Sequence, residues 1–134
     1  MDVGGRRKGF HLAIVDDARL RAGPVRVAGV REAVRWLCWR SPRLIAVDSP
    51  RAPAPTGDRS RPEERLLARS VCGIRYTPER ALLRSSRYYA WILNGLALYA
   101  ALEEAGLEAI ECFPTASFTR WAGARGSRTR AALT

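Results

Sequence analysis

The chain has 134 residues, enough for one packed domain, and 47% apolar with 27% charged residues is a globular composition. Its 23 basic and 13 acidic residues give a formal net charge of +10, which attracts polyanions such as nucleic acid. The longest apolar stretch, residues 88–102, is shorter than the roughly 20 residues that span a bilayer, so we expect a buried helix and no membrane segment. The first residues lack the pattern of a secretory signal peptide, so we expect a cytoplasmic protein.

Hydrophobic periodicity and turn residues predict one mixed α/β domain over residues 1–134. The apolar runs predict strands at residues 10–15, 24–28, 44–47 and 109–113, with a hairpin turn at Asp16 and Asp17. The helical periodicity predicts helices at residues 30–39 and 63–71, one from residue 78 or 79 to 104 capped by Gly106, and one from Thr115 to Gly123. Residues 51–62 are rich in proline and arginine and predict an exposed loop.

The cysteines and the single histidine exclude several kinds of site. Cys38, Cys72 and Cys112 have neither disulfide-framework nor zinc-ligand spacing, and His11 lies in an alternating run that is typical of a strand. Any metal chemistry therefore rests on carboxylates, whose oxygen atoms suit Mg²⁺ or Mn²⁺. Among the aromatic residues, Trp36 and Trp39 are predicted to be core, and only Trp121 is considered for base stacking.

Two acids occupy positions that hydrophobicity does not explain. Asp48 ends an apolar strand and Glu111 lies inside another, where an unpaired carboxylate is costly to bury. Ligands of open α/β sheets gather beyond the carboxyl ends of the strands, and two acids there can share a divalent cation. The alternative is that each acid pairs with one of the many arginines, and the spacing alone does not decide between them.

Two further acids lie in charged motifs. Asp2 precedes two glycines and the basic residues 6–8, a turn that lets the backbone approach a phosphate or metal closely. Glu64 lies among Arg61, Arg65 and Arg69, a pattern equally typical of a solvated charge cluster on a helix.

Four motifs occur in an order that resembles a known family. Residues 2–10, 45–50, 61–69 and 110–116 read DVGGRRKGF, IAVDSP, RPEERLLAR and IECFPTA. Together they resemble domain of unknown function 429, a group of bacterial and archaeal proteins expected to be ribonuclease-H-like nucleases. The resemblance covers nearly the whole chain and implies a ribonuclease-H-like mixed sheet flanked by helices.

The resemblance also implies roles for particular residues. Asp2, Asp48 and Glu111 match the acids of the first, fourth and fifth strands, while Glu64 and Arg69 match an acid and an arginine in the central helix. Relatives have apolar residues before the first acid and a further helical region at the C-terminus. We therefore expect this chain to lack part of the first strand and that region, with a helix just beginning at residues 126–129.

The leading functional hypothesis is a metal-dependent nuclease that hydrolyses phosphodiesters with carboxylate-held Mg²⁺ or Mn²⁺. Its expected catalytic residues are Asp2, Asp48, Glu111 and Glu64, of which Asp2, Asp48 and Glu111 are the expected metal ligands. Its expected contacts with nucleic acid are Arg6, Arg7, Lys8, Arg61, Arg65 and Arg69.

Two alternatives remain, and oligomerisation is an additional expectation. The first alternative is a non-catalytic module of the same fold that binds nucleic acid or a phosphate ligand. The second, an actin-like or sugar-kinase-like nucleotide binder, ranks last because such proteins need a second domain. The strongly apolar segment 88–102 also makes a homo-oligomer plausible.

Overall fold

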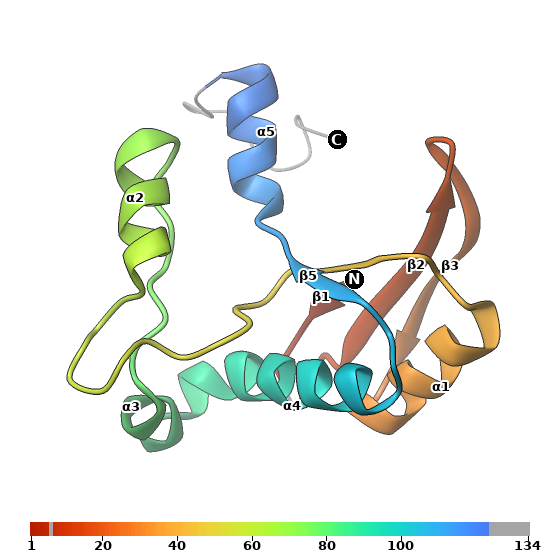
Figure 1. The fold of residues 1–134 in the computed structure, drawn as a ribbon, viewed down its shortest axis with the longest axis horizontal. Helices are drawn as coiled ribbons and strands as arrows, with labels where there is room; N and C mark the ends of the chain where they lie inside the picture. Colours follow the sequence, from red (N-terminus) through yellow and green to blue (C-terminus); the bar gives the residue numbers. More distant parts are fainter. Residues whose placement is uncertain (6, 124–134) are drawn as a thin grey trace.

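A computed structural model describes residues 1–5 and 7–123 of the chain, so Arg6 and the helix expected at residues 126–129 lie outside the described residues. The arrangement is α/β, as predicted, with a mixed sheet and helices around it (Figure 1). The strands are β1 (Asp2–Val3), β2 (Phe10–Asp16), β3 (Arg19–Val27), β4 (Ile45–Val47) and β5 (Ala109–Glu111). The helices are α1 (Val30–Arg40), α2 (Pro62–Ser70), α3 (Arg80–Ser85), the 3₁₀ turn η1 (Arg87–Tyr89), α4 (Ala90–Glu104) and α5 (Pro114–Ala122).

The sheet has an antiparallel part and a parallel part that meet at β1. Strands β1, β2 and β3 pair antiparallel in that order, while β4 and β5 pair parallel. A parallel bridge between Asp2 and Asp48 joins the two parts, and the backbone N–H of Asp48 donates to the carbonyl of Met1 at 2.9 Å. The strands therefore follow one another in the order β3, β2, β1, β4, β5, with β1 in the centre.

The hydrophobic core lies on one face of this sheet. Side chains alternate between the two faces along each strand, so Val3, Leu12 and Val47 are buried while Asp2 and His11 are exposed. Helices α1 and α4 cover the buried face, and their core residues are Ala33, Leu37, Leu98, Tyr99 and Leu102. We call the other side, which carries Asp2 and His11, the open face. In Figure 1, α2 and α5 extend upward from the body that the sheet, α1 and α4 form.

The prediction of one long helix from residue 78 or 79 to 104 is wrong, because the backbone is extended at Ser86. There φ is −140° and ψ is 138°, and the Ser86 side chain accepts the backbone N–H of Tyr88 at 3.2 Å. A serine hydroxyl competes with helical hydrogen bonds and favours a new helix start, so the segment divides into α3, η1 and α4. The prediction for the end of this segment is confirmed: Gly106, with a φ of 69°, follows the last turn of α4.

Helix α4 is apolar on most sides because it is buried within this chain. Its buried residues are Ile92, Gly95, Leu98, Tyr99 and Leu102. The apolarity of residues 88–102 therefore has an explanation that requires no second copy of the chain. Within the described ranges, no helix combines the length and the apolarity that a membrane span needs.

Candidate active site

The structure brings together two of the predicted acids, Asp2 and Asp48. Asp2 belongs to the central strand β1, and Asp48 directly follows β4, so the bridge between them places the two residues side by side. Residues opposite each other on paired strands project from the same face, which here is the open face. The Asp2 side chain is 66% exposed, and His11 Nδ1 lies 3.6 Å from its carboxylate. The pair is therefore near solvent in the middle of the sheet.

Close packing behind Asp48 holds the backbone of this pair. Ser49 is buried, and the hydroxyl of Tyr99 in α4 donates to its carbonyl at 3.2 Å. A Cβ on Gly95 would lie 1.9 Å from Ser49 Oγ, so only glycine lets α4 approach so closely. The contacts of Tyr99 and Gly95 in α4 with Ser49 therefore position the backbone immediately after Asp48.

The third predicted acid, Glu111, lies apart from this pair. It stands opposite Val47, which is fully buried under the helices, so Glu111 projects from the covered face. Both terminal nitrogens of Arg61 donate hydrogen bonds to its carboxylate, and the bond from Nη1 is 2.8 Å long. The backbone N–H of Arg51 donates to the same carboxylate at 2.9 Å. For Glu111 the structure thus has the arginine pairing that the sequence left open as an alternative. In residues 1–5 and 7–123, no group of three or more His, Cys, Asp or Glu side chains is placed to hold a metal ion.

Glu64, the fourth predicted acid, is buried at the start of α2 and is only 1% exposed. Its carboxylate accepts the backbone N–H and the Nε of Arg61 at 3.1 and 3.0 Å, and the backbone N–H of Thr77 at 2.9 Å. The Thr77 hydroxyl donates to the same carboxylate. We call Arg61, Glu64, Thr77 and Glu111 the Arg61 network. It ties the first turn of α2 to the end of β5.

Arg61 is the centre of the network and is 4% exposed, so its guanidinium points inward. Burial by itself lowers the pKa of Arg61, but the hydrogen bond and charge of Glu111, followed by those of Glu64, more than offset it and raise the pKa. The cation is therefore permanent, and its donors are directed at protein carboxylates. The sequence analysis assigned Arg61 to contacts with nucleic acid; the Arg61–Glu64 spacing of three residues is the signal that could have indicated this pairing.

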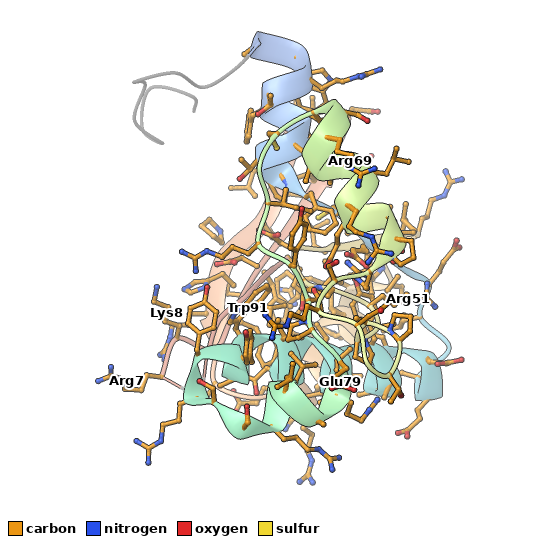
Figure 2. The ribbon with its side chains drawn as sticks, turned by 90° about the vertical axis from the view of Figure 1, so that its left-hand side faces the viewer. Arg7, Lys8, Arg51, Arg69, Glu79 and Trp91 are labelled. Carbon is orange, nitrogen blue, oxygen red and sulfur yellow. The ribbon has the colours of Figure 1, made fainter. Side chains whose placement is uncertain are left out.

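The other predicted basic contacts lie on separate surfaces. Arg7 and Lys8 are exposed in the turn after β1, where Arg26 holds their carbonyl oxygens at 2.6 and 2.8 Å. Arg65 donates to the carbonyl of Ser60 at 2.8 Å, and Arg69 is exposed on α2. Figure 2 shows Arg69 well away from Arg7 and Lys8. These side chains therefore do not form one continuous patch.

Two neighbours of the acids were not singled out from the sequence. Burial, and then the charge of Asp48, raise the pKa of the Cys112 thiol, which follows β5. Burial, and then the charge of Glu111, raise the pKa of Tyr99. Both groups therefore stay protonated near neutral pH, and a protonated thiol is a poor nucleophile. Periodicity does not mark either residue for the site: Cys112 follows Glu111 in the chain, but only the tertiary fold brings it to Asp48, and only the tertiary fold brings Tyr99 to Glu111.

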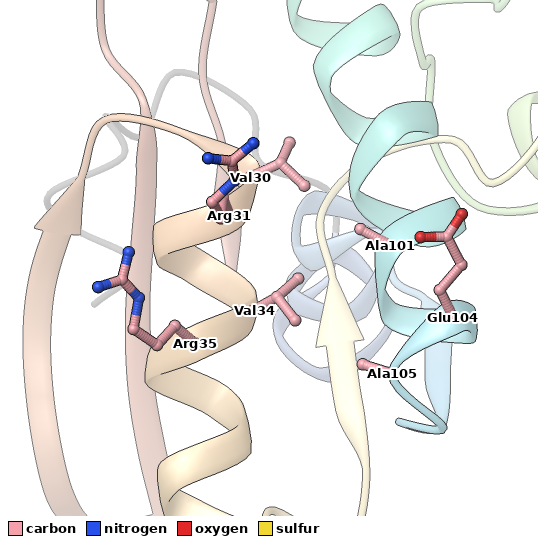
Figure 3. Close-up of a pocket in the computed structure, with 7 residues that line it drawn as sticks. All are labelled: Val30, Arg31, Val34, Arg35, Ala101, Glu104 and Ala105. Carbon is pink, nitrogen blue, oxygen red and sulfur yellow. The ribbon is translucent and has the colours of Figure 1, made fainter.

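A large hollow lies elsewhere, between α1 and α4, with a volume of about 810 Å³. Figure 3 shows Val30 and Val34 of α1 facing Ala101 and Ala105 of α4 across it. It is on the covered side of the sheet, opposite the Asp2–Asp48 pair. The candidate site is therefore the open face that carries the acid pair and not the hollow.

The fold and the acid pair define an α/β protein with two adjacent aspartates at the centre of a mixed sheet. The chain belongs to the family described as protein of unknown function (DUF429), which matches residues 1–132. The family resemblance of the four motifs is thereby confirmed. No curated protein and no solved structure matches the chain.

Proposed function

We propose that this protein is a metal-dependent nuclease with a ribonuclease-H-like sheet. The observation that supports it most is the bridge between Asp2 and Asp48, which places two carboxylates side by side on the open face of the central strands. The resemblance predicts acids on the first strand and at the end of the fourth, and β1 pairs directly beside the end of β4. Mg²⁺ and Mn²⁺ are the proposed cofactors.

The residues present fit a magnesium-type ion. Mg²⁺ is commonly bound by only one or two carboxylates, with waters and substrate phosphates as its other ligands. Asp2 and Asp48 supply the two carboxylates, and the exposure of Asp2 leaves room for a substrate. When bound, such an ion activates a water for attack on phosphorus and stabilises the leaving oxygen.

The remaining residues of the proposed site position the acids or the substrate. Arg7 and Lys8 lie in the turn that follows Asp2 and would hold the phosphate backbone without reading sequence. Glu111 and Glu64 act through the Arg61 network, which fixes β5 and α2 relative to each other. We therefore assign ion binding to Asp2 and Asp48 and a positioning role to Glu64 and Glu111.

A second candidate function has its own support. Glu111, one of the three metal ligands that the resemblance implies, is instead engaged by Arg61 and Arg51. That arrangement favours a module that binds nucleic acid or another phosphate ligand without cleaving it. Such a module binds equally well with and without a chelator, whereas a nuclease needs the ion.

The test is cleavage of labelled single-stranded DNA, duplex DNA and RNA–DNA hybrid in Mg²⁺ or Mn²⁺. We expect cleavage by the wild type, and a loss of about 100-fold or more with chelator or in Asp48→Asn, because the ion then lacks a charged ligand. Asp17→Asn is the matched control: it removes an exposed acid at the tip of the β2–β3 hairpin, where φ is 46° and asparagine is well tolerated.

The outcomes separate the two candidates. Cleavage that persists in Asp48→Asn contradicts the assigned ligand. Binding without cleavage by the folded wild type overturns the nuclease proposal and favours the binding module.

A further inference from the structure

Trp39, which the sequence analysis predicted to be core, is 80% exposed, so that prediction is wrong. Trp39 follows the buried Leu37 by two residues, and two residues correspond to a rotation of about 200° around a helix. Trp39 therefore lies on the opposite side of α1 from Leu37. Trp36, three residues earlier, is half-buried and packs against the core. A large exposed indole therefore stands at the C-terminal end of α1 and requires an explanation.

Arg40 stacks on both indoles. Its Cζ lies 4.1 Å from the centre of the Trp36 ring and 4.6 Å from that of Trp39. Its Nη1 is buried and has no hydrogen-bond partner among the described residues, so ring contact and not a carboxylate holds this cation. We call Trp36, Trp39 and Arg40 the tryptophan platform. In it, one arginine contacts both rings and keeps its positive charge.

The surroundings of the platform are basic. A hollow of about 520 Å³ adjoins it, lined by Val27, Glu32, Arg35, Trp36 and Trp39. Residues 30–44 contain four arginines and one glutamate, a net charge of +3. Glu32 accepts the backbone N–H of Ala28 at 3.0 Å, so its carboxylate is engaged by the segment that precedes α1. Aromatic planes among basic side chains are the chemistry that binds the bases and phosphates of single strands.

We propose that the tryptophan platform is a stacking site for a base of single-stranded nucleic acid. A duplex hides the faces of its bases in the stack, whereas a single strand offers them to an exposed indole. The inference rests on the proposed function and names the form of its substrate. Because α1 covers the face opposite Asp2, the platform contributes affinity and not chemistry.

The test is the affinity for a fluorescent oligothymidylate, measured by anisotropy in chelator so that no cleavage occurs. We expect Trp39→Ala to weaken binding about tenfold and Trp39→Phe to retain most of it, because phenylalanine still offers a ring. Leu66→Ala is the control, since Leu66 is a large apolar side chain that is 67% exposed but offers no ring to a base. It should leave the affinity unchanged, and Trp39→Ala should leave the affinity for duplex DNA unchanged.

The proposed stacking site is overturned if the wild type does not bind the oligothymidylate, if Trp39→Ala binds it within twofold of the wild type, or if Leu66→Ala loses as much affinity as Trp39→Ala. These outcomes are distinct from those of the nuclease proposal. Binding that depends on Trp39 without any metal-dependent cleavage supports the platform and contradicts the nuclease. Metal-dependent cleavage by the wild type together with unchanged binding by Trp39→Ala supports the nuclease and contradicts the platform.

Discussion

Gly95 and Ser49 form the closest approach between α4 and the segment that carries Asp48. A Cβ on Gly95 would lie 1.9 Å from Ser49 Oγ and 2.7 Å from Ser49 Cβ, so an added methyl group has no space. The glycine interrupts an otherwise apolar helix, where glycine ordinarily costs about 1 kcal/mol relative to alanine. Close contact at the site outweighs helix propensity at this position.

We therefore expect Gly95→Ala to lower the free energy of unfolding by about 1–3 kcal/mol, the usual cost of overpacking a core. Urea unfolding measures the effect. Gly73→Ala is the control, because an added Cβ there meets no atom within 4 Å. A Gly95→Ala protein as stable as the wild type would contradict the close approach.

At the scale of elements, α2 is held to the body by polar contacts more than by apolar ones. Its buried residue is Glu64, whereas Leu66 is 67% exposed. The Arg61 network supplies the anchor, with the Arg61 guanidinium between Glu64 and Glu111. Removing one partner of a buried charge network leaves an uncompensated charge and is strongly destabilising.

We expect Arg61→Met to cost about 3–5 kcal/mol of unfolding free energy, because Glu64 then remains buried without its cation. Arg65→Met is the matched control, since Arg65 also lies near the start of α2 and its side chain donates only to the carbonyl and the hydroxyl of Ser60 in the part of the chain that the structure describes. Urea unfolding compares the two, and hydrogen exchange in residues 62–70 reports whether α2 detaches. Equal stability of the two variants would exclude the network as the anchor.

On the scale of the whole molecule, the net charge of +10 attracts polyanions and makes their binding electrostatic. Every phosphate that a basic side chain neutralises releases counterions, so affinity falls with salt. The exposed Arg7 and Lys8 in the turn after β1 are the contacts assigned to the site, whereas the platform contributes stacking. Salt dependence therefore separates the two kinds of contact.

We expect the logarithm of the affinity for single-stranded DNA to fall linearly with the logarithm of salt concentration. The double variant Arg7→Gln, Lys8→Gln should reduce the magnitude of the slope by about one to two, because two phosphate contacts are lost. Lys8→Arg, which keeps the charge, should preserve the slope. Titration of binding from low to moderate salt measures it, and an unchanged slope in the double variant would remove both residues from the interface.

Much of the fold follows from local sequence signals. The predicted strand at residues 10–15 and the helix at residues 30–39 coincide closely with β2 and α1, because alternating and helical periodicities are strong in those segments. The break at Ser86 was missed, since one serine changes the average apolarity of its segment very little. The exposure of Trp39 was missed because spacing from Trp36 does not tell which side of α1 meets the sheet.

The sequence by itself determined the α/β class, the basic character, the family membership of the four motifs and the candidate acids, because these depend on residue type and local order. Only the tertiary structure decided which acids meet. Pairing of β1 with the end of β4 brings Asp2 to Asp48, while the register of β5 turns Glu111 to the covered face and Arg61. Strand pairing joins residues far apart in the chain, and a shift of one residue reverses the face, so no local pattern specifies it.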